Sequence, residues 1–330
     1  MSLRRREFIA AVAGAGAWPI AASAQQRQRI RGIGVMSPNA ENDPATQAQI
    51  ATFRAEFRKL GWVEGRNIRI DYRWGSGDAA RVRPLAAELM AIAPDVIVAN
   101  GTTAAVAFQQ MTRTIPIVFV NVPDPLANGL VTSLPHPGGN ITGFANNEQL
   151  VAVKLLELLK QIAPRVTRVA FVYDSMNPNG PGYLAVLQAA APSLGMQVSE
   201  APLREAADIE RTIDAFAREP DGGLIVKSSP ILNVHRERLI NSAAHRSLPA
   251  VYEFRFFVVD GGLASYGTDN NEGYRGAAGY VDRILKGDRP GDLPVQFATK
   301  IELVINTRTA KALGLEVPLA LLIRADELIE

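Results

Sequence analysis

The amino-acid sequence predicts an α/β fold of two similar lobes, each a parallel sheet with helices covering its faces. Three observations lead to this prediction. Short apolar segments that suit buried strands alternate with helical patterns along most of the chain. The alternation stops at Pro137-Gly138-Gly139-Asn140 and then restarts. The 330 residues, 47% of them hydrophobic, suffice for one large or two ordinary cores.

The first α/β unit combines four predicted strands with three helices. The strands are expected at residues 31–37, 67–74, 95–99 and 115–122. The first helix, residues 45–60, carries Ile50, Phe53 and Phe57 on one face, and Gly61 closes it. The other helices are expected at residues 78–90, where Asp78 is the cap, and at residues 102–111.

The segment from residue 115 to 143 separates the two units. Its strand is too apolar to alternate, which is typical of a strand buried inside a parallel sheet. It breaks at Pro123-Asp124-Pro125, where two prolines fix φ and hold the acid on a stiff loop. We interpret the segment as a binding loop followed, at Gly143, by the first crossing between the lobes.

The second unit repeats the pattern. Helices are expected at residues 146–162, 182–194, 208–218, 234–245, 272–285 and 307–313. Strands are expected at residues 168–173, 196–201, 223–227, 249–252, 262–266 and 302–305. No low-complexity linker separates the units, so we expect short, close crossings between lobes rather than a tether.

The N-terminal 24 residues are typical of an export signal. Arg4-Arg5-Arg6 is followed by an apolar stretch at residues 8–22 and by a small-residue cleavage site ending at Ala24. The paired arginines favour twin-arginine export, with a Sec signal as the alternative. The whole chain carries 35 Lys and Arg against 33 Asp and Glu, a net +2. The same surplus lies in the signal, so no nucleic-acid partner is predicted.

Polar side chains follow the predicted strands, where ligands of parallel sheets bind. The candidate ligand-binding residues are Ser37, Asn39, Thr102, Thr103, Asn121, Asp124, Asp174, Asn177, Ser229, Tyr252, Glu253 and Tyr266. The set contains hydroxyls, amides and a few acids, and it lacks histidine. Such a lining is typical of a recognition site, in which a few polar groups orient a ligand.

Each candidate has a competing structural role. Thr102 and Thr103 offer a helix N-terminus to a ligand carboxylate, or else merely cap that helix. Asp124 could bind a ligand amine, or cap the turn that follows it. Tyr252 and Tyr266 could form an aromatic wall, or pack in the core.

An enzyme is disfavoured. The three histidines form no chelating pair, the chain has no cysteine, and the nucleophile motif G-x-S-x-G does not occur. No strand leads into G-x-G-x-x-G or a phosphate loop, so no nucleotide cofactor is predicted, and no metal.

Several motifs resemble a known family. They include residues 61–67 (GWVEGRN), Asp124-Pro125, the run from Gly129 to Asn140, residues 261–267 (GGLASYG) and residues 310–315 (AKALGL). Together they resemble the periplasmic type I solute-binding proteins of ABC importers, in particular the subfamily often called tryptophan/tyrosine-binding. Residues 295–298 (VQFA) depart from the family's usual proline-rich run, away from the strand ends.

The resemblance implies two Rossmann-like lobes joined by a three-crossing hinge. Lobe 1 would hold residues 30–142 and about 268–297, and lobe 2 would hold residues 143–267 and about 298–330. It further implies a periplasmic monomer that captures a carboxylate-bearing solute, either an aromatic amino acid or an aromatic or branched acid. A membrane permease and its ATPase would be the partners. A sensory module that presents ligand to a membrane receptor, and an exported enzyme on the same fold, are the alternatives.

Overall fold

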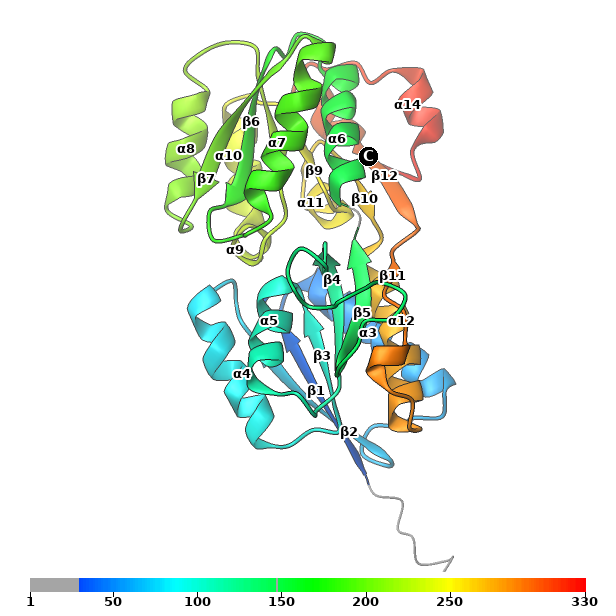
Figure 1. Ribbon diagram of the computed structural model, residues 1–330. Helices are drawn as coiled ribbons and strands as arrows, with labels where there is room; N and C mark the ends of the chain where they lie inside the picture. Colours follow the sequence, from blue (N-terminus) through cyan, green and yellow to red (C-terminus); the bar gives the residue numbers. More distant parts are fainter. Residues whose placement is uncertain (1–29, 147) are drawn as a thin grey trace, which may run out of the picture.

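The computed structural model describes residues 30–146 and 148–330, and the predicted export signal at residues 1–24 lies outside them. The chain forms two α/β lobes stacked end to end (Figure 1). One lobe contains a six-stranded sheet of order β11-β5-β4-β3-β1-β2, and the other a seven-stranded sheet of order β13-β12-β10-β9-β8-β6-β7. Every pairing is parallel except that of β10 with β12. The predicted fold class is confirmed.

Lobe 1 contains most of the first half of the chain. Its strands are β1 (Arg31–Ser37), β2 (Ile68–Trp74), β3 (Val96–Asn100), β4 (Ile117–Pro123), β5 (Ile141–Asn146) and β11 (Gln296–Phe297). Its helices are α3 (Pro44–Lys59), η1 (Ala79–Arg81), α4 (Val82–Ala91), α5 (Thr102–Met111), α12 (Asn270–Leu285) and η3 (Pro290–Asp292).

Lobe 2 contains the remainder. Its strands are β6 (Arg168–Asp174), β7 (Gln197–Leu203), β8 (Gly222–Val226), β9 (Ala250–Tyr252), β10 (Ala264–Thr268), β12 (Ile301–Asn306) and β13 (Glu327–Ile329). Its helices are α6 (Glu148–Ile162), α7 (Gly180–Ala190), η2 (Ala191–Leu194), α8 (Asp208–Phe216), α9 (Pro230–Val234), α10 (Arg236–His245), α11 (Arg255–Val259), α13 (Thr307–Ala312) and α14 (Leu319–Arg324).

The strands are apolar on both faces because helices cover both. In lobe 1, Val96 and Val98 of β3 contribute to a core with α3 and α12, whereas Ile97 between them contributes to a core with α4 and α5. Successive side chains of a strand point to opposite faces, so an uninterrupted apolar run serves both cores. Lobe 2 is built the same way, with α6 and α7 over one face and α8 and α10 over the other.

The first crossing lies later in the chain than predicted. Residues 141–146 form β5, which pairs with β4 and β11, so lobe 1 extends to Asn146 rather than to residue 142. A Cβ at Gly143 would lie 2.1 Å from the backbone oxygen of Phe119 on β4. Gly143 therefore permits a close approach of two strands and does not mark a hinge.

The second and third crossings lie beside each other. The chain returns to lobe 1 between β10 and α12, and it leaves again between β11 and β12. The Glu272 carboxylate accepts hydrogen bonds from the backbone N–H groups of Thr299 and Lys300, each at 2.9 Å. The backbone N–H of Asp269 donates to the Lys300 carbonyl. These bonds hold the two crossings together at one edge of the interlobe interface.

Candidate ligand-binding site between the two lobes

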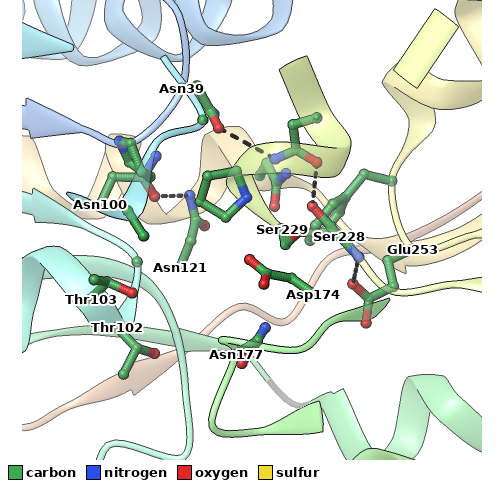
Figure 2. A pocket seen from close by; sticks show the side chains of 18 of the residues that line it. Asn39, Asn100, Thr102, Thr103, Asn121, Asp174, Asn177, Ser228, Ser229 and Glu253 are labelled. Atoms are coloured by element: carbon green, nitrogen blue, oxygen red, sulfur yellow. Dashed lines mark hydrogen bonds between the residues drawn. The ribbon is translucent and has the colours of Figure 1, made fainter. Parts of the chain in front are cut away.

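A cavity of about 370 Å³ lies between the lobes. Its lining includes residues at or just beyond the carboxyl ends of β1, β3 and β4 in lobe 1 and of β6, β8 and β9 in lobe 2. Figure 2 shows the labelled polar side chains converging on this space from both lobes. The position agrees with the rule that parallel sheets bind ligands at the carboxyl ends of their strands.

The N-terminus of α5 forms one wall. Gly101 is the N-cap, with φ of 82°, and the described residues form no side-chain capping hydrogen bond there. Glycine adopts this backbone conformation without strain, whereas other residues rarely do. Thr102 and Thr103 therefore do not cap their own helix. The uncapped N–H groups and the positive end of the helix dipole face the cavity and suit an anion such as a carboxylate.

Carboxamides of lobe 1 stand beside this helix. The Asn121 side-chain N–H donates to the Asn100 oxygen at 3.1 Å (Figure 2). The Asn39 side-chain N–H donates to the Thr46 hydroxyl at 3.2 Å, and Asn39 is 8% exposed. Because neighbouring groups fix these amides, their remaining donors and acceptors are presented to the cavity in a defined orientation.

Asp174 faces this wall from lobe 2. It is the last residue of β6, and one carboxylate oxygen accepts from the Met176 backbone N–H at 2.8 Å. Partial burial raises the pKa of Asp174, and the hydrogen bond from Met176 lowers it in part. Within the described chain Asp174 forms no ion pair. The carboxylate therefore lacks a counter-charge and suits a cation.

The other acids that line the cavity differ from Asp174. Glu253 is 3% exposed and lies 3.5 Å from the ammonium of Lys227, which is 1% exposed. Glu253 also accepts from the Ser228 backbone N–H at 2.7 Å. Asp43 is paired with Arg236 at 2.6 Å, and Asp78 is exposed. No lysine or arginine is among the described residues that line the cavity. Among the acids that line the cavity, Asp174 is thus the half-buried one without a cationic partner in the described chain.

The lobes touch around the cavity. The Asn233 side-chain N–H donates to the Asn39 oxygen at 3.4 Å, and the Asn128 amide donates to Asn179 at 3.3 Å. A Cβ at Gly77 in lobe 1 would lie 3.2 Å from the Pro230 carbonyl of lobe 2. Together with the Asp43–Arg236 ion pair, these contacts bridge the two lobes beside the cavity.

Eight of the twelve predicted residues line this cavity. They are Asn39, Thr102, Thr103, Asn121, Asp174, Asn177, Ser229 and Glu253. All of them lie near or after the carboxyl ends of strands, and these ends meet between the lobes. Their role in binding stays a prediction, but the structure brings them together as that prediction requires.

Asp124 lies outside the cavity lining. Its carboxylate accepts from the backbone N–H of Ala127 at 2.9 Å, and its carbonyl accepts from Asn128. The residue has φ of 40°, which a short polar side chain tolerates. The capping role that competed with amine binding is therefore the one that the structure displays.

Three further candidates are also outside the lining. Ser37 is fully buried beneath Asn39, whose backbone N–H approaches the serine hydroxyl at 3.3 Å. Tyr252 is 1% exposed, and its ring stacks on Phe257 with centroids 4.8 Å apart. Tyr266 packs against the core of lobe 2. Both tyrosines adopt the core-packing role that was the alternative to an aromatic wall.

Sequence reasoning missed part of the lining. Asp43, Gln49 and Asn233 lie on or beside helices, and Phe254 and Phe256 lie around the start of α11. The motif Phe254-Arg255-Phe256-Phe257 after a strand was a signal for an aromatic wall next to Tyr252. The residues on helices gave no such signal, because they reach the cavity only when the two lobes meet.

In residues 30–146 and 148–330, no three His, Cys, Asp or Glu side chains are grouped so that they could hold a metal ion. None of the helices in this part of the chain is long and apolar enough to cross a membrane.

The chain is similar to known binding proteins over nearly its whole length. A family model described as ABC transporter substrate binding protein matches residues 38–329. A tyrosine-binding protein from Clostridioides difficile is 28% identical over 298 residues, which are 88% of this chain and 82% of the relative. These matches confirm the resemblance found in the motifs.

Solved structures share the fold. A conserved domain protein from Vibrio cholerae has a TM-score of 0.83 at 30% identity, with 91% of this chain and all of that chain covered. An ABC domain in complex with L-Trp from Streptococcus pneumonia also has a TM-score of 0.83, at 24% identity and with the same coverage. A ligand-free, open substrate binding protein from Clostridium difficile has a TM-score of 0.66 at 25% identity, covering 91% of this chain and 99% of that one.

Proposed function

The chain belongs to the family of ABC transporter substrate binding proteins, and from this premise we propose that it captures an amino acid with a large apolar side chain for an ABC importer. The protein would be exported and would act in the periplasm as a monomer. It would deliver the ligand to a membrane permease coupled to an ATPase. The ligand would occupy the interlobe cavity, and the lobes would close around it.

The opposed charges of the cavity walls carry this proposal. The uncapped N-terminus of α5 in lobe 1 would hold the ligand carboxylate, with the hydroxyls of Thr102 and Thr103 as further donors. Asp174 of lobe 2 would hold the ammonium. An α-amino acid has its ammonium and carboxylate groups bonded to the same carbon, so it would complete the two walls at once.

The remainder of the lining supports a large apolar side chain. Phe254 and Phe256 border the cavity, and its volume of about 370 Å³ falls in the range of small-molecule sites. The Clostridioides difficile relative is a tyrosine-binding protein, which favours an aromatic amino acid. A ligand that contacts both lobes binds the closed form more tightly than the open one, so binding would shift the population toward closure.

A ligand screen tests the proposal. Thermal unfolding would be followed with the common L-amino acids and with aromatic and branched acids that lack the amine. A ligand at 100 times its dissociation constant adds about 2.7 kcal/mol to the free energy of unfolding, which is an easily measured rise in Tm. We expect L-tryptophan or L-tyrosine to raise the Tm most, and the deamino acids to raise it least.

Small-angle scattering with and without the best ligand would measure closure. We expect a smaller radius of gyration with ligand. If no compound of the screen raised the Tm, amino-acid capture would be wrong. If compounds bound without compaction, capture would stand and the hinge mechanism would be wrong.

A further inference from the structure

A second, smaller cavity of about 170 Å³ adjoins the main one. Five residues line both cavities: Ala45, Gln49, Phe254, Phe256 and Asn270. These five residues form the boundary between the two spaces, which we call the neck. Ala45 and Gln49 belong to α3 and Asn270 begins α12, so they come from lobe 1, while the two phenylalanines come from lobe 2.

The side-chain oxygens of two carboxamides in the neck have no hydrogen-bond partner among the described residues. Gln49 is 4% exposed, and its side-chain oxygen is buried without a hydrogen bond. The side-chain oxygen of Asn270 is in the same state. Leaving such a group unsatisfied is costly, so the native structures of proteins rarely retain one without a reason. The amides of Asn39, Asn121 and Asn233 in the main cavity all hydrogen-bond to other side chains.

The neck presents different chemistry on its two sides. Phe254 and Phe256 have ring centroids 5.7 Å apart and offer an aromatic surface from lobe 2. Gln49 and Asn270 offer amide groups from lobe 1, and either end of each amide can be turned toward a partner. A flat ring with a polar atom on its edge matches both sides, because its face packs on phenylalanine while its edge reaches an amide.

We propose that the neck is the subsite for the tip of the ligand side chain, and that Gln49 and Asn270 hydrogen-bond to a polar group there. This inference rests on the proposed function. It narrows the ligand class to aromatic amino acids whose ring carries an N–H or O–H group, as an indole or a phenol does. The main cavity holds the α-amino acid part, and the neck reads the end of the ring.

The unpaired amide oxygens of Gln49 and Asn270 would distinguish ligands with a polar ring atom from ligands without one. A ligand without a polar ring atom would leave these buried oxygens unpaired. Sites built to pair a substrate N–H or O–H therefore reject analogues that lack it far more strongly than hydrophobic pockets reject a missing methylene. We expect at least about tenfold weaker binding for the analogue, the effect of one lost hydrogen bond to a buried group.

Calorimetric titration of the whole protein tests the subsite with two matched ligand pairs. L-tyrosine is compared with L-phenylalanine, and L-tryptophan with 1-methyl-L-tryptophan, whose indole N–H is blocked. Gln49→Leu removes the amide and keeps a side chain of similar size. We expect it to weaken binding of the polar-edged ligand of each pair by about tenfold and to leave the analogue unchanged or tighter. Gln47→Leu, at an exposed position of the same helix, is the control and should change neither.

The outcomes separate this inference from the proposed function. If the wild-type protein bound both members of each pair equally, the subsite would be wrong while amino-acid capture stood. This comparison needs no variant, so a Gln49→Leu protein that failed to fold would not remove the test. An unchanged tyrosine-to-phenylalanine ratio in a folded Gln49→Leu protein would also overturn the role of Gln49. If no amino acid bound at all, the proposed function itself would fail.

Discussion

The two walls of the interlobe cavity are built from different chemistry although the two lobes share one architecture. Lobe 1 presents the uncapped N-terminus of α5 and carboxamides such as Asn100 and Asn121, which hydrogen-bond to each other. Lobe 2 presents the unpaired carboxylate of Asp174 and the rings of Phe254 and Phe256. In the proposed function each wall would complement one part of a zwitterion, and neither wall would complete the site alone. The fold would then supply the place of the site, and the difference between the walls would supply its selectivity.

Neutralising the acid of lobe 2 is the strongest test of this difference. Asp174→Asn keeps an acceptor for the Met176 N–H but removes the charge. A charge-assisted hydrogen bond contributes about 2–3 kcal/mol, so we expect the dissociation constant of an α-amino acid to rise on the order of 100-fold. Binding of the deamino acid should change little. Titration calorimetry with both ligands measures the two constants.

Asp124→Asn is the matched control, because that carboxylate caps Ala127 outside the cavity lining. Asparagine also caps turns, so affinity should be unaffected. Equal losses of the amine-bearing and deamino ligands in Asp174→Asn would remove Asp174 from the amine role. A selective loss in Asp124→Asn would return that role to the loop on which the sequence placed it.

The parts of the fold that could be predicted are those that leave a local pattern in the sequence. Strands such as β3 and β8 were recognisable because both faces are buried, which requires an uninterrupted apolar run. The strand β5 was missed because Gly143 interrupts it, and the close approach to Phe119 that requires a glycine is visible only in three dimensions. The two-residue β11 pairs with β5 about 150 residues earlier in the chain, and no local pattern encodes such a pairing.

The residues around the interlobe cleft likewise fall into a group that could be predicted from the sequence and a group that could not. Residues at or just after the ends of strands, such as Asp174 and Asn177, could be predicted because topology alone brings the ends of strands together. Gln49 and Arg236 could not, because they reach the cleft from helices, at positions set by how one lobe closes on the other. Tyr252 was a candidate for an aromatic wall, with core packing as the alternative; its ring packs on Phe257, while nearby Phe254 and Phe256 border the cavity.

The two lobes also contact each other directly, through an ion pair that can be compared with the proposed ligand contacts. Asp43 of lobe 1 pairs with Arg236 of lobe 2 at 2.6 Å, and the two side chains are 8% and 11% exposed. Arg236 also pairs with Asp260 of its own lobe. Asp43 caps α3 by accepting from the Thr46 N–H at 2.8 Å, a role that asparagine can fill. Asp43→Asn thus removes the interlobe charge pair and keeps the cap.

We expect Asp43→Asn to favour the open form. Arg236 keeps Asp260, so the loss is about 1 kcal/mol rather than that of a fully isolated charge, and the apparent dissociation constant should rise roughly fivefold. The loss should be equal for amine-bearing and deamino ligands, since the Asp43 charge that is removed is already neutralised by Arg236. Scattering should show a larger ligand-free radius of gyration.

Asp260→Asn, which removes only the contact within lobe 2, is the control. An unchanged radius together with an unchanged affinity would show that the ion pair does not hold the lobes closed.

The smallest expected effect is a gain of stability from Asp174→Asn, the same substitution that should cost the most ligand affinity. Burial raises the pKa of Asp174 in the folded protein, so in the absence of ligand the folded state holds its proton to a higher pH than the unfolded chain does. Stability then falls as pH rises through the window between the unfolded and the folded pKa, because the folded state binds more protons there. Above that window the charged carboxylate lowers the free energy of unfolding.

Asp174→Asn should therefore raise the ligand-free Tm slightly at neutral pH and leave it nearly unchanged well below the usual aspartate pKa. Calorimetric unfolding at the two pH values would measure both. A lower Tm at neutral pH would mean that the Asp174 carboxylate already has a stabilising partner in the free protein, and the wall of lobe 2 would then no longer need an ammonium ion to balance it.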